Sequence, residues 1–212
     1  MTNKELFYDI VESKILDYRA DFTDFLAYLE TTSFFDDPAS ARKHCSYKGG
    51  LLEHSLNVYF ALVDLYYKTK HTSNYSIDSI AIVSLLHDVC KIGTYKQSYW
   101  NKKKYLTNEE ILKVKDKRSL KKDSLGQFIW TEEERFENQE NFAFGHGEKS
   151  VYIISKYFDL KDYEAQAIRF HMGPWIESDK YYLSNAFEEN ELALYLHWAD
   201  EYATYIVEKE NT

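Results

Sequence analysis

The segment of residues 76–93 constrains the fold of this chain more than any other. Its apolar residues follow a helix pattern that leads directly into His87 and Asp88, and Ile80, Val83 and His87 fall on roughly one face. A buried imidazole beside a buried carboxylate is costly unless both are satisfied, and a bound cation satisfies both at once. The segment therefore predicts a buried helix that carries two potential metal ligands into the interior.

The ends of this helix are also marked in the sequence. Ser76 is a candidate N-cap, and Gly93 is a candidate C-terminal cap that follows Lys91 in the last turn. We therefore predict a helix that continues through His87 and Asp88 until it reaches the glycine.

Few residues in the rest of the chain would interrupt helices. The 212 residues include only two prolines and seven glycines, and a chain of this length is typical of one domain with a substantial core. We predict an all-α fold class, with a helical bundle formed by a single domain of residues 1–212. Residues 1–40 repeat apolar and aromatic side chains at helical spacing and predict N-terminal packing helices, while residues 44–206 form the predicted core.

Residues 94–141 change in character and predict a small insertion that resembles a β-hairpin. Residues 94–100 alternate loosely between polar and apolar side chains and are expected to pair with residues 127–131. A basic run at 102–122 precedes an acidic run at 132–140, a pattern typical of a solvated insertion that pairs with itself. The alternative is that the insertion lies over a functional site and its lysines hold substrate phosphates.

Charge and cysteine usage exclude several classes of protein. The formal net charge of −9 argues against broad nucleic-acid binding, so we expect no stable nucleic-acid complex, but a small phosphate substrate held by metals stays possible. The chain has no apolar run of membrane-spanning length and no signal-peptide pattern, and Cys45 and Cys90 lack disulfide or metal spacing. We expect a cytoplasmic protein without membrane contact. The oligomeric state is left open.

Further histidines and aspartates occur in settings that suit metal ligands. His54 follows a Gly-Gly pair at the start of an apolar helix pattern, and His146 has glycines on both sides. His171 lies near the end of a helix that Gly-Pro stops, and Asp200 follows an apolar stripe. Buried aspartates are rare without a partner or a metal. His44 is open to interpretation as a surface, outer-layer or ligand histidine.

Together these motifs supply six imidazole and carboxylate ligands. Such ligands suit Mn, Fe, Mg, Ni, Co or catalytic Zn, and they exclude a structural Cys-rich zinc site. Four ligands can hold one ion, and six can hold two if one carboxylate bridges them, so we expect two divalent metal ions. The predicted metal ligands are His54, His87, Asp88, His146, His171 and Asp200. His197 falls at a different angle on its helix and is not expected to be a ligand.

This pattern resembles the HD superfamily of metal-dependent phosphohydrolases, whose signature runs H, then HD, then D. His146 and His171 are similar to the two additional histidines of its binuclear members, such as phosphodiesterases of the HD-GYP type. Residues 49–55 resemble the HD domain of bacterial 3′–5′ exoribonucleases. Residues 145–150 and 167–173 resemble small stand-alone HD proteins of bacteria and phages. The resemblance covers residues 44 to about 206.

The resemblance implies a division of the ligands between two metals. His54, His87, Asp88 and Asp200 would hold one ion, while Asp88 would share the other with the two additional histidines. Lys91 follows Asp88 by three residues and lies on nearly the same face. In the binuclear relatives a lysine at this place contacts the phosphate, so Lys91 and Asp88 are the predicted catalytic residues. The alternative role for Lys91 is that of a helix-capping residue.

We therefore expect a metal-dependent phosphohydrolase that uses a metal-activated water on a small phosphorylated substrate, either a nucleotide or a phosphodiester. Three alternatives stay open. The chain could be a 3′–5′ exonuclease for short oligonucleotides, a non-catalytic HD module that binds a nucleotide or a partner, or an HD-fold oxygenase with a di-iron site.

Overall fold

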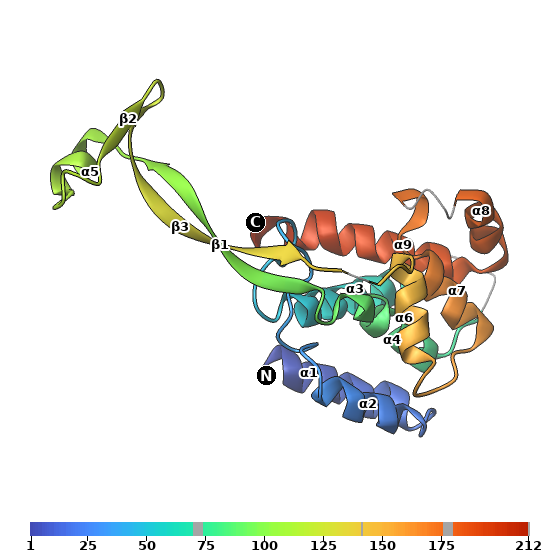
Figure 1. The fold of residues 1–212 in the computed structure, drawn as a ribbon. Helices are drawn as coiled ribbons and strands as arrows, with labels where there is room; N and C mark the ends of the chain where they lie inside the picture. The colour runs from blue at the N-terminus through green and yellow to red at the C-terminus, as the bar shows by residue number, and fades with distance from the viewer. Residues whose placement is uncertain (70–73, 141, 176–179, 212) are drawn as a thin grey trace.

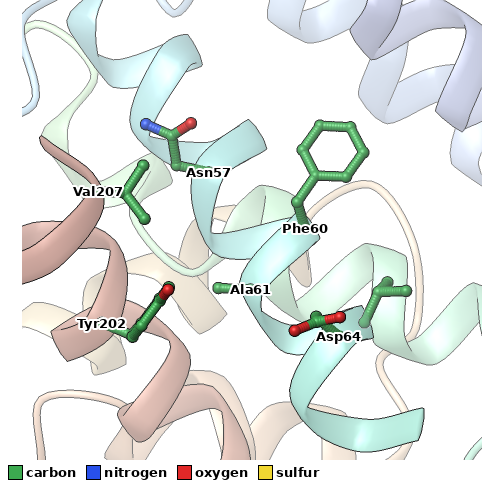
Figure 2. A pocket seen from close by; sticks show the side chains of 7 residues that line it. Asn57, Phe60, Ala61, Asp64, Tyr202 and Val207 are labelled. Atoms are coloured by element: carbon green, nitrogen blue, oxygen red, sulfur yellow. The ribbon is translucent and has the colours of Figure 1, made fainter. Parts of the chain in front are cut away.

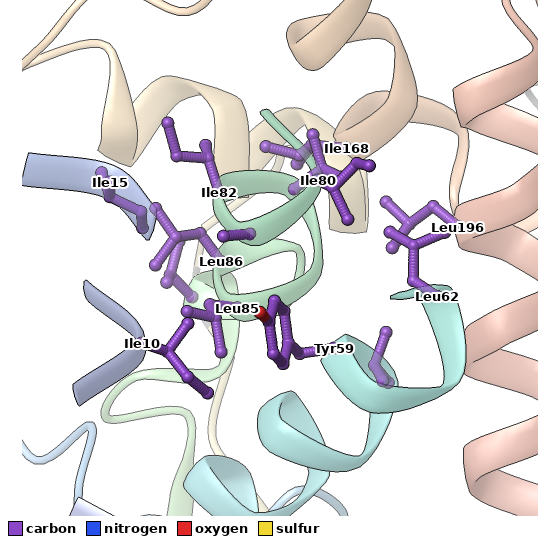
Figure 3. Close-up of a cluster of buried hydrophobic side chains, with 14 of the residues drawn as sticks. Ile10, Ile15, Tyr59, Leu62, Ile80, Ile82, Leu85, Leu86, Ile168 and Leu196 are labelled. Atoms are coloured by element: carbon purple, nitrogen blue, oxygen red, sulfur yellow. The ribbon is translucent and has the colours of Figure 1, made fainter. Parts of the chain in front are cut away.

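Helix α4 (Ile77–Leu86) lies at the centre of the helical body and is buried from Asp78 to Leu86. The structure, a computed structural model, describes residues 1–69, 74–140, 142–175 and 180–211. Side chains from other helices surround α4 on several sides (Figure 3). A largely apolar helix that is buried on every side is stable only inside a core, and the predicted burial of this segment is confirmed. The helices that contact α4 include α3 (Gly50–Lys68), α7 (Asp162–Phe170) and α9 (Glu191–Tyr202), and the π-helical segment Val11–Leu16 also packs on it.

The end of α4 differs from the prediction. The helix stops at Leu86 with His87 as its C-cap, and a short 3₁₀ helix, η2 (Val89–Lys91), follows before Gly93. Asp88 lies between the two helices with φ −107° and ψ 15°. Successive side chains on an α-helix point about 100° apart, so the break helps His87 and Asp88 to face the same region, with His87 Nε2 3.4 Å from Asp88 Oδ2. The predicted continuation of the helix to Gly93 was wrong.

The N-terminal part forms packing helices, as predicted. It consists of α1 (Asn3–Ile10), a π-helical segment η1 (Val11–Leu16) and α2 (Phe22–Glu30). The phenyl ring of Phe22 lies 5.3 Å from that of Phe158 between ring centroids, and Phe25 lies 5.6 Å from the same ring. These contacts join the first helices of the chain to its C-terminal half.

The remaining helices complete the body around α4. They are α6 (His146–Ile154), η3 (Gly173–Trp175), α8 (Lys180–Glu189), η5 (Ala203–Val207) and η6 (Glu208–Asn211). Helix α6 packs on α7 and on η2, and α7 packs on α9. Among the described residues we find no helix with both the length and the apolarity needed to cross a bilayer.

The all-α prediction was wrong, because residues 95–138 form an antiparallel sheet that projects from the helical body (Figure 1). This arm contains β1 (Tyr95–Tyr105), α5 (Asn108–Lys113), β2 (Lys121–Asp123) and β3 (Gly126–Asn138), with strand order β1-β3-β2. The protein is therefore helix-rich but mixed α and β. The strands are rich in lysine and glutamate, so they lack a clear alternation of apolar and polar residues. Ion pairs across the strands stabilise them, as in Lys102–Glu133 at 2.5 Å, and such pairs can be recognised only when the register is known.

The predicted strand pairing also had the wrong register. Trp100 pairs with Glu133, while Phe128 pairs with Tyr105, so residues 127–131 face the distal half of β1. The predicted end of the insertion, residue 141, lies outside the described residues. The arm extends away from the body (Figure 1), so the alternative that the lysines of the basic run cover the site is wrong. Ion pairs within the arm, such as Lys103–Asp123 at 2.6 Å, agree with a self-paired insertion.

Candidate metal centre

Three fully buried histidines direct their Nε2 atoms to a common point. His54 lies in the first turns of α3, and His87 and His171 are the C-caps of α4 and α7. His87 Nδ1 lies 2.8 Å from the Ser84 carbonyl oxygen, and His171 Nδ1 lies 2.6 Å from that of Ile168. Because a carbonyl only accepts hydrogen bonds, each Nδ1 carries a hydrogen, and Nε2 is the ring nitrogen available to a cation.

The surroundings of these Nε2 atoms are unusual for buried polar atoms. His87 Nε2 lies 3.3 Å from His54 Nε2, a distance at which two ring nitrogens need a proton or a cation between them. His171 Nε2 is buried without a hydrogen-bond partner. Buried polar atoms are almost always satisfied, so the unpaired Nε2 atom of His171, near the close contact between His54 and His87, fits a bound cation.

Asp88 lies between two sets of imidazoles. Its Oδ2 atom is 3.4 Å from the Nε2 atoms of both His54 and His87. Its Oδ1 atom is 2.7 Å from His146 Nε2 and 3.7 Å from His171 Nε2. The two carboxylate oxygens therefore face different histidine pairs, an arrangement that suits a carboxylate bridging two ions.

Asp200, from α9, completes the set of predicted ligands. Its Oδ1 atom lies 3.2 Å from His54 Nε2, and possible ligand atoms of Asp200, His87 and His171 lie within 4.8 Å of one another. The structure thus brings together all six residues that the sequence nominated. Buried His, Asp and Cys groups around Asp88 could hold metal ions.

Charge pairing dominates the electrostatics of the centre. Burial by itself would lower the pKa of His54, but hydrogen bonds to Asp200, Asp88 and Glu208 outweigh it and raise this pKa well above its ordinary value. Burial would raise the pKa of Asp88, yet the Lys91 ammonium and the neighbouring imidazoles hold it well below the usual range. The carboxylates therefore stay ionised, as metal ligands must be.

The two histidines near Asp88 Oδ1 differ from each other. Burial opposes the charged form of His146, but Cys90 and Asp88 overcome it and raise the pKa of His146 to about 10. His171 is buried more completely, and burial lowers its pKa. Without a metal, His146 thus carries a proton that a cation would displace, whereas His171 already presents a free lone pair.

Glu208 is a site residue that the sequence did not indicate. Its Oε1 atom accepts a hydrogen bond from His54 Nδ1 at 3.0 Å and one from Asn57 Nδ2 at 3.0 Å, and the side chain is 1% exposed. Carboxylates of this kind orient metal-binding histidines and fix their tautomer. Glu208 lies in the polar C-terminal stretch, 154 positions from His54, and no local pattern distinguishes it from a solvated residue.

His44 and Cys90 lie beside the centre. The ring of His44 packs 4.8 Å from that of His54 between centroids, and both of its ring nitrogens are buried without a partner. Burial and the charge of His54 lower the pKa of His44 to about 4. Cys90 lies close enough to Asp88 and His146 to form a potential ligand group with them. The cysteine spacing in the sequence did not predict this position.

His197 contacts the backbone of the candidate ligand His171. Its Nδ1 atom lies 2.8 Å from the backbone carbonyl oxygen of His171. Gly173 allows this approach, because a Cβ atom there would lie 2.5 Å from the His197 ring. The expectation that His197 is not one of the converging ligands agrees with this position.

A pocket of about 370 Å³ opens onto the centre. Asp88, Lys91, His146 and Asp200 line it, and Lys91 Nζ lies 2.5 Å from Asp88 Oδ2. The lysine thus faces the carboxylate and forms an ion pair with it. Aromatic side chains also line the pocket, namely Tyr95, Trp175 and Tyr205.

A second hollow lies on the surface between α3 and the C-terminal segment (Figure 2). Asp64 is the one carboxylate among its lining residues, which otherwise include Phe60, Tyr202 and Val207. It contains no group of potential metal ligands among the described residues. The pocket over Asp88 is therefore the better candidate for chemistry.

Comparisons of the chain with protein families, with curated proteins and with solved structures found no match. The function proposed below is therefore argued from the residues and their geometry.

Proposed function

We propose that this protein is a metal-dependent phosphohydrolase of the HD type, which acts on a nucleotide or another phosphoester through a metal-activated water. The observation that carries the proposal is the position of Asp88, whose two oxygens face separate pairs of histidines. Two divalent ions, drawn from Mn, Fe, Mg, Ni, Co or Zn, fit this ligand set. His54, His87, Asp88 and Asp200 would hold one, and Asp88, His146 and His171 the other.

Ions in such a site lower the pKa of a coordinated water and neutralise the oxygens of a phosphoryl group. The protein residues supply the rest of the chemistry. Asp88 would fix the separation of the ions, and Glu208 would keep His54 Nε2 directed at them. The Lys91 side chain lines the pocket, and its ammonium would neutralise charge that develops on the phosphoryl oxygens.

Hydrolysis of bis(p-nitrophenyl) phosphate and of a nucleotide panel by Mn²⁺-loaded protein tests this proposal. We expect turnover by the unaltered chain, and we expect Asp88→Asn to reduce it to the rate of Mn²⁺ in buffer. Asp9→Asn, on the exposed face of α1, is the matched control and should keep full activity.

Thermal unfolding separates loss of chemistry from loss of fold, and metal analysis reports the number of ions in each protein. Equal rates for a folded Asp88→Asn variant and for the unaltered chain would contradict the proposal. Metal binding without turnover on any phosphoester would favour a non-catalytic module instead.

A further inference from the structure

The charge of this protein is divided unevenly between its two parts. Residues 113–122, at the distal part of the arm, include six lysines or arginines and one aspartate, although the whole chain has a net charge of −9. The six basic side chains of this run are all exposed. The net charge of −9 is therefore the sum of an acidic helical body and a basic segment at the tip of the arm, residues 113–122. The expectation of no nucleic-acid complex was based on that average.

The strand register places aromatic rings on one face of the arm. Side chains of directly paired residues lie on the same face, and alternate pairs share a face. The pairs Lys103–Trp130 and Tyr105–Phe128 are two residues apart, and Lys121 of β2 pairs with Phe128. One distal face of the sheet therefore combines three aromatic rings with two lysines and Asp123. The Asp123 carboxylate pairs with Lys103 at 2.6 Å and accepts a hydrogen bond from the Tyr105 hydroxyl at 2.9 Å.

Part of this face is accessible to a ligand. Trp130 is 52% exposed and Tyr105 is 40% exposed, while Phe128 is buried beneath its neighbours. The Lys103 ammonium lies 4.6 Å from the centroid of the Phe128 ring and 5.8 Å from that of Trp130. The exposed rings suit a flat ligand, and the neighbouring basic run of residues 113–122 suits an anionic one.

We propose that the distal arm is a binding surface for single-stranded nucleic acid. Unpaired bases stack on exposed aromatic rings, while lysines and arginines neutralise the phosphates without reading sequence. A duplex keeps its base faces covered, so Trp130 and Tyr105 favour a single strand. This surface is separate from the metal centre and does not depend on the proposed phosphohydrolase activity.

A second copy of the chain is the main competing occupant, because its acidic body would also attract a basic tip. The aromatic rings favour nucleic acid over this alternative, since stacking requires exposed planar partners and charge attraction alone does not. The test below includes self-association as a distinct outcome.

Fluorescence anisotropy with labelled 20-nucleotide oligo(dT) and oligo(U), in EDTA to prevent metal-dependent cleavage, tests the proposal on the full chain. We expect both strands to bind more tightly than a duplex of equal length. The arm variant replaces four exposed lysines by glutamine, at Lys113, Lys115, Lys121 and Lys122. The control variant makes the same change at four exposed lysines of the helical body, namely Lys4, Lys48, Lys68 and Lys156.

The arm variant should bind at least about tenfold more weakly, and the slope of log K against log salt should decrease by about 0.7 for each phosphate that the altered arm no longer neutralises. The control, which has the same net charge, should stay within about twofold of the unaltered chain. Trp130→Ala should weaken binding about five- to a hundredfold without changing the salt slope.

Absence of binding by the unaltered chain at low salt would overturn the proposal, and so would equally weakened binding in the arm and control variants. Sedimentation that shows a dimer for the unaltered chain and a monomer for the arm variant, without oligonucleotide binding, would assign the tip to self-association. Because the assay contains EDTA, its result is independent of whether the metal centre hydrolyses phosphoesters.

Discussion

At the scale of single residues, hydrogen bonds to Nδ1 atoms organise the centre. Backbone carbonyls set the tautomers of His87 and His171, and the Glu208 carboxylate holds His54. The Nε2 atoms that would face an ion are therefore oriented without one. Orientation by a second layer of residues lowers the cost of binding, because less rotational freedom is lost when the metal enters.

Glu208→Gln should lower metal affinity about ten- to a hundredfold, since the amide keeps the shape of the side chain but loses the charge that orients His54. Competition with a chromophoric chelator measures the affinity. Glu201→Gln, at the rim of the same pocket, is the control and should bind normally. Unchanged affinity in Glu208→Gln would show that the carboxylate does not position His54.

Lys91→Ala should lower kcat about a hundred- to a thousandfold, the cost of removing one group that stabilises transition-state charge. Its ammonium contacts Asp88 but cannot coordinate a metal, so the variant should keep its full complement of ions. Steady-state kinetics and metal analysis on the same sample test both expectations. A variant that loses its metal while its rate per bound ion stays normal would assign Lys91 a structural role.

The protonation of His146 predicts how metal and pH act on stability. Burial opposes its charge, but Cys90 and Asp88 raise its pKa to about 10, above about 6.5 for an unfolded chain. In metal-free protein this charge pair stabilises the fold fully below about pH 6.5 and is lost as the pH rises toward the folded pKa. Metal replaces the proton, so the gap in melting temperature between Mn²⁺-loaded and EDTA-treated protein should widen from about pH 6.5 to about pH 9. A constant gap would contradict this.

At the scale of helices and strands, the ends of helices create the site. His87 and His171 are C-caps, and His146 is the first residue of α6. Gly147 permits the close approach of α6 to α7, because a Cβ atom there would lie 2.4 Å from the Arg169 carbonyl oxygen. The distance between α6 and α7 therefore sets the distance between the candidate ligands His146 and His171.

Gly147→Ala should destabilise the protein by about 1–3 kcal/mol, the usual cost of overpacking. It should also weaken metal binding, because moving α6 away from α7 separates His146 from His171. Gly145→Ala is the matched control, since its Cβ would meet only the end of the Glu148 side chain, at 3.1 Å. Urea unfolding and chelator competition compare the two variants, and similar results for both would exclude this coupling.

At the scale of the whole molecule, the arm and the helical body do not share a hydrophobic core among the described residues. The main cluster of buried apolar residues includes no arm residue within the described chain. The arm lies outside the body (Figure 1), and cross-strand ion pairs and aromatic contacts support it. A two-stranded ribbon is marginally stable without additional packing, so the third strand and α5 contribute at the distal end.

Replacing residues 98–135 by Asn-Gly, which joins the paired residues Gln97 and Phe136 through a tight turn, should leave the body intact. We expect a change in stability below about 1 kcal/mol, or about 2–4 °C in Tm, with normal metal content. Calorimetry and metal analysis test this. A large loss of either would show that the arm supports the body.

The sequence alone determined the central buried helix, the N-terminal packing helices and the six candidate ligands. The helices were predicted from the spacing of apolar residues, and the candidate ligands from polar residues in apolar surroundings, such as His87 and Asp88. Both kinds of signal lie within a short stretch of sequence. The strand pairing was wrong because register depends on contacts between segments some 30 residues apart, such as Trp100 with Glu133.

Only the tertiary structure decided that the six candidate ligands meet and that Asp88 directs one oxygen to each histidine pair. It alone also showed that Glu208 accepts a hydrogen bond from His54 Nδ1. It also decided that the basic run lies at the end of an arm and not over the metal centre. These features depend on how helices pack and where a strand pair points. Such long-range geometry follows from the summed burial of many side chains, which no short stretch of residues contains.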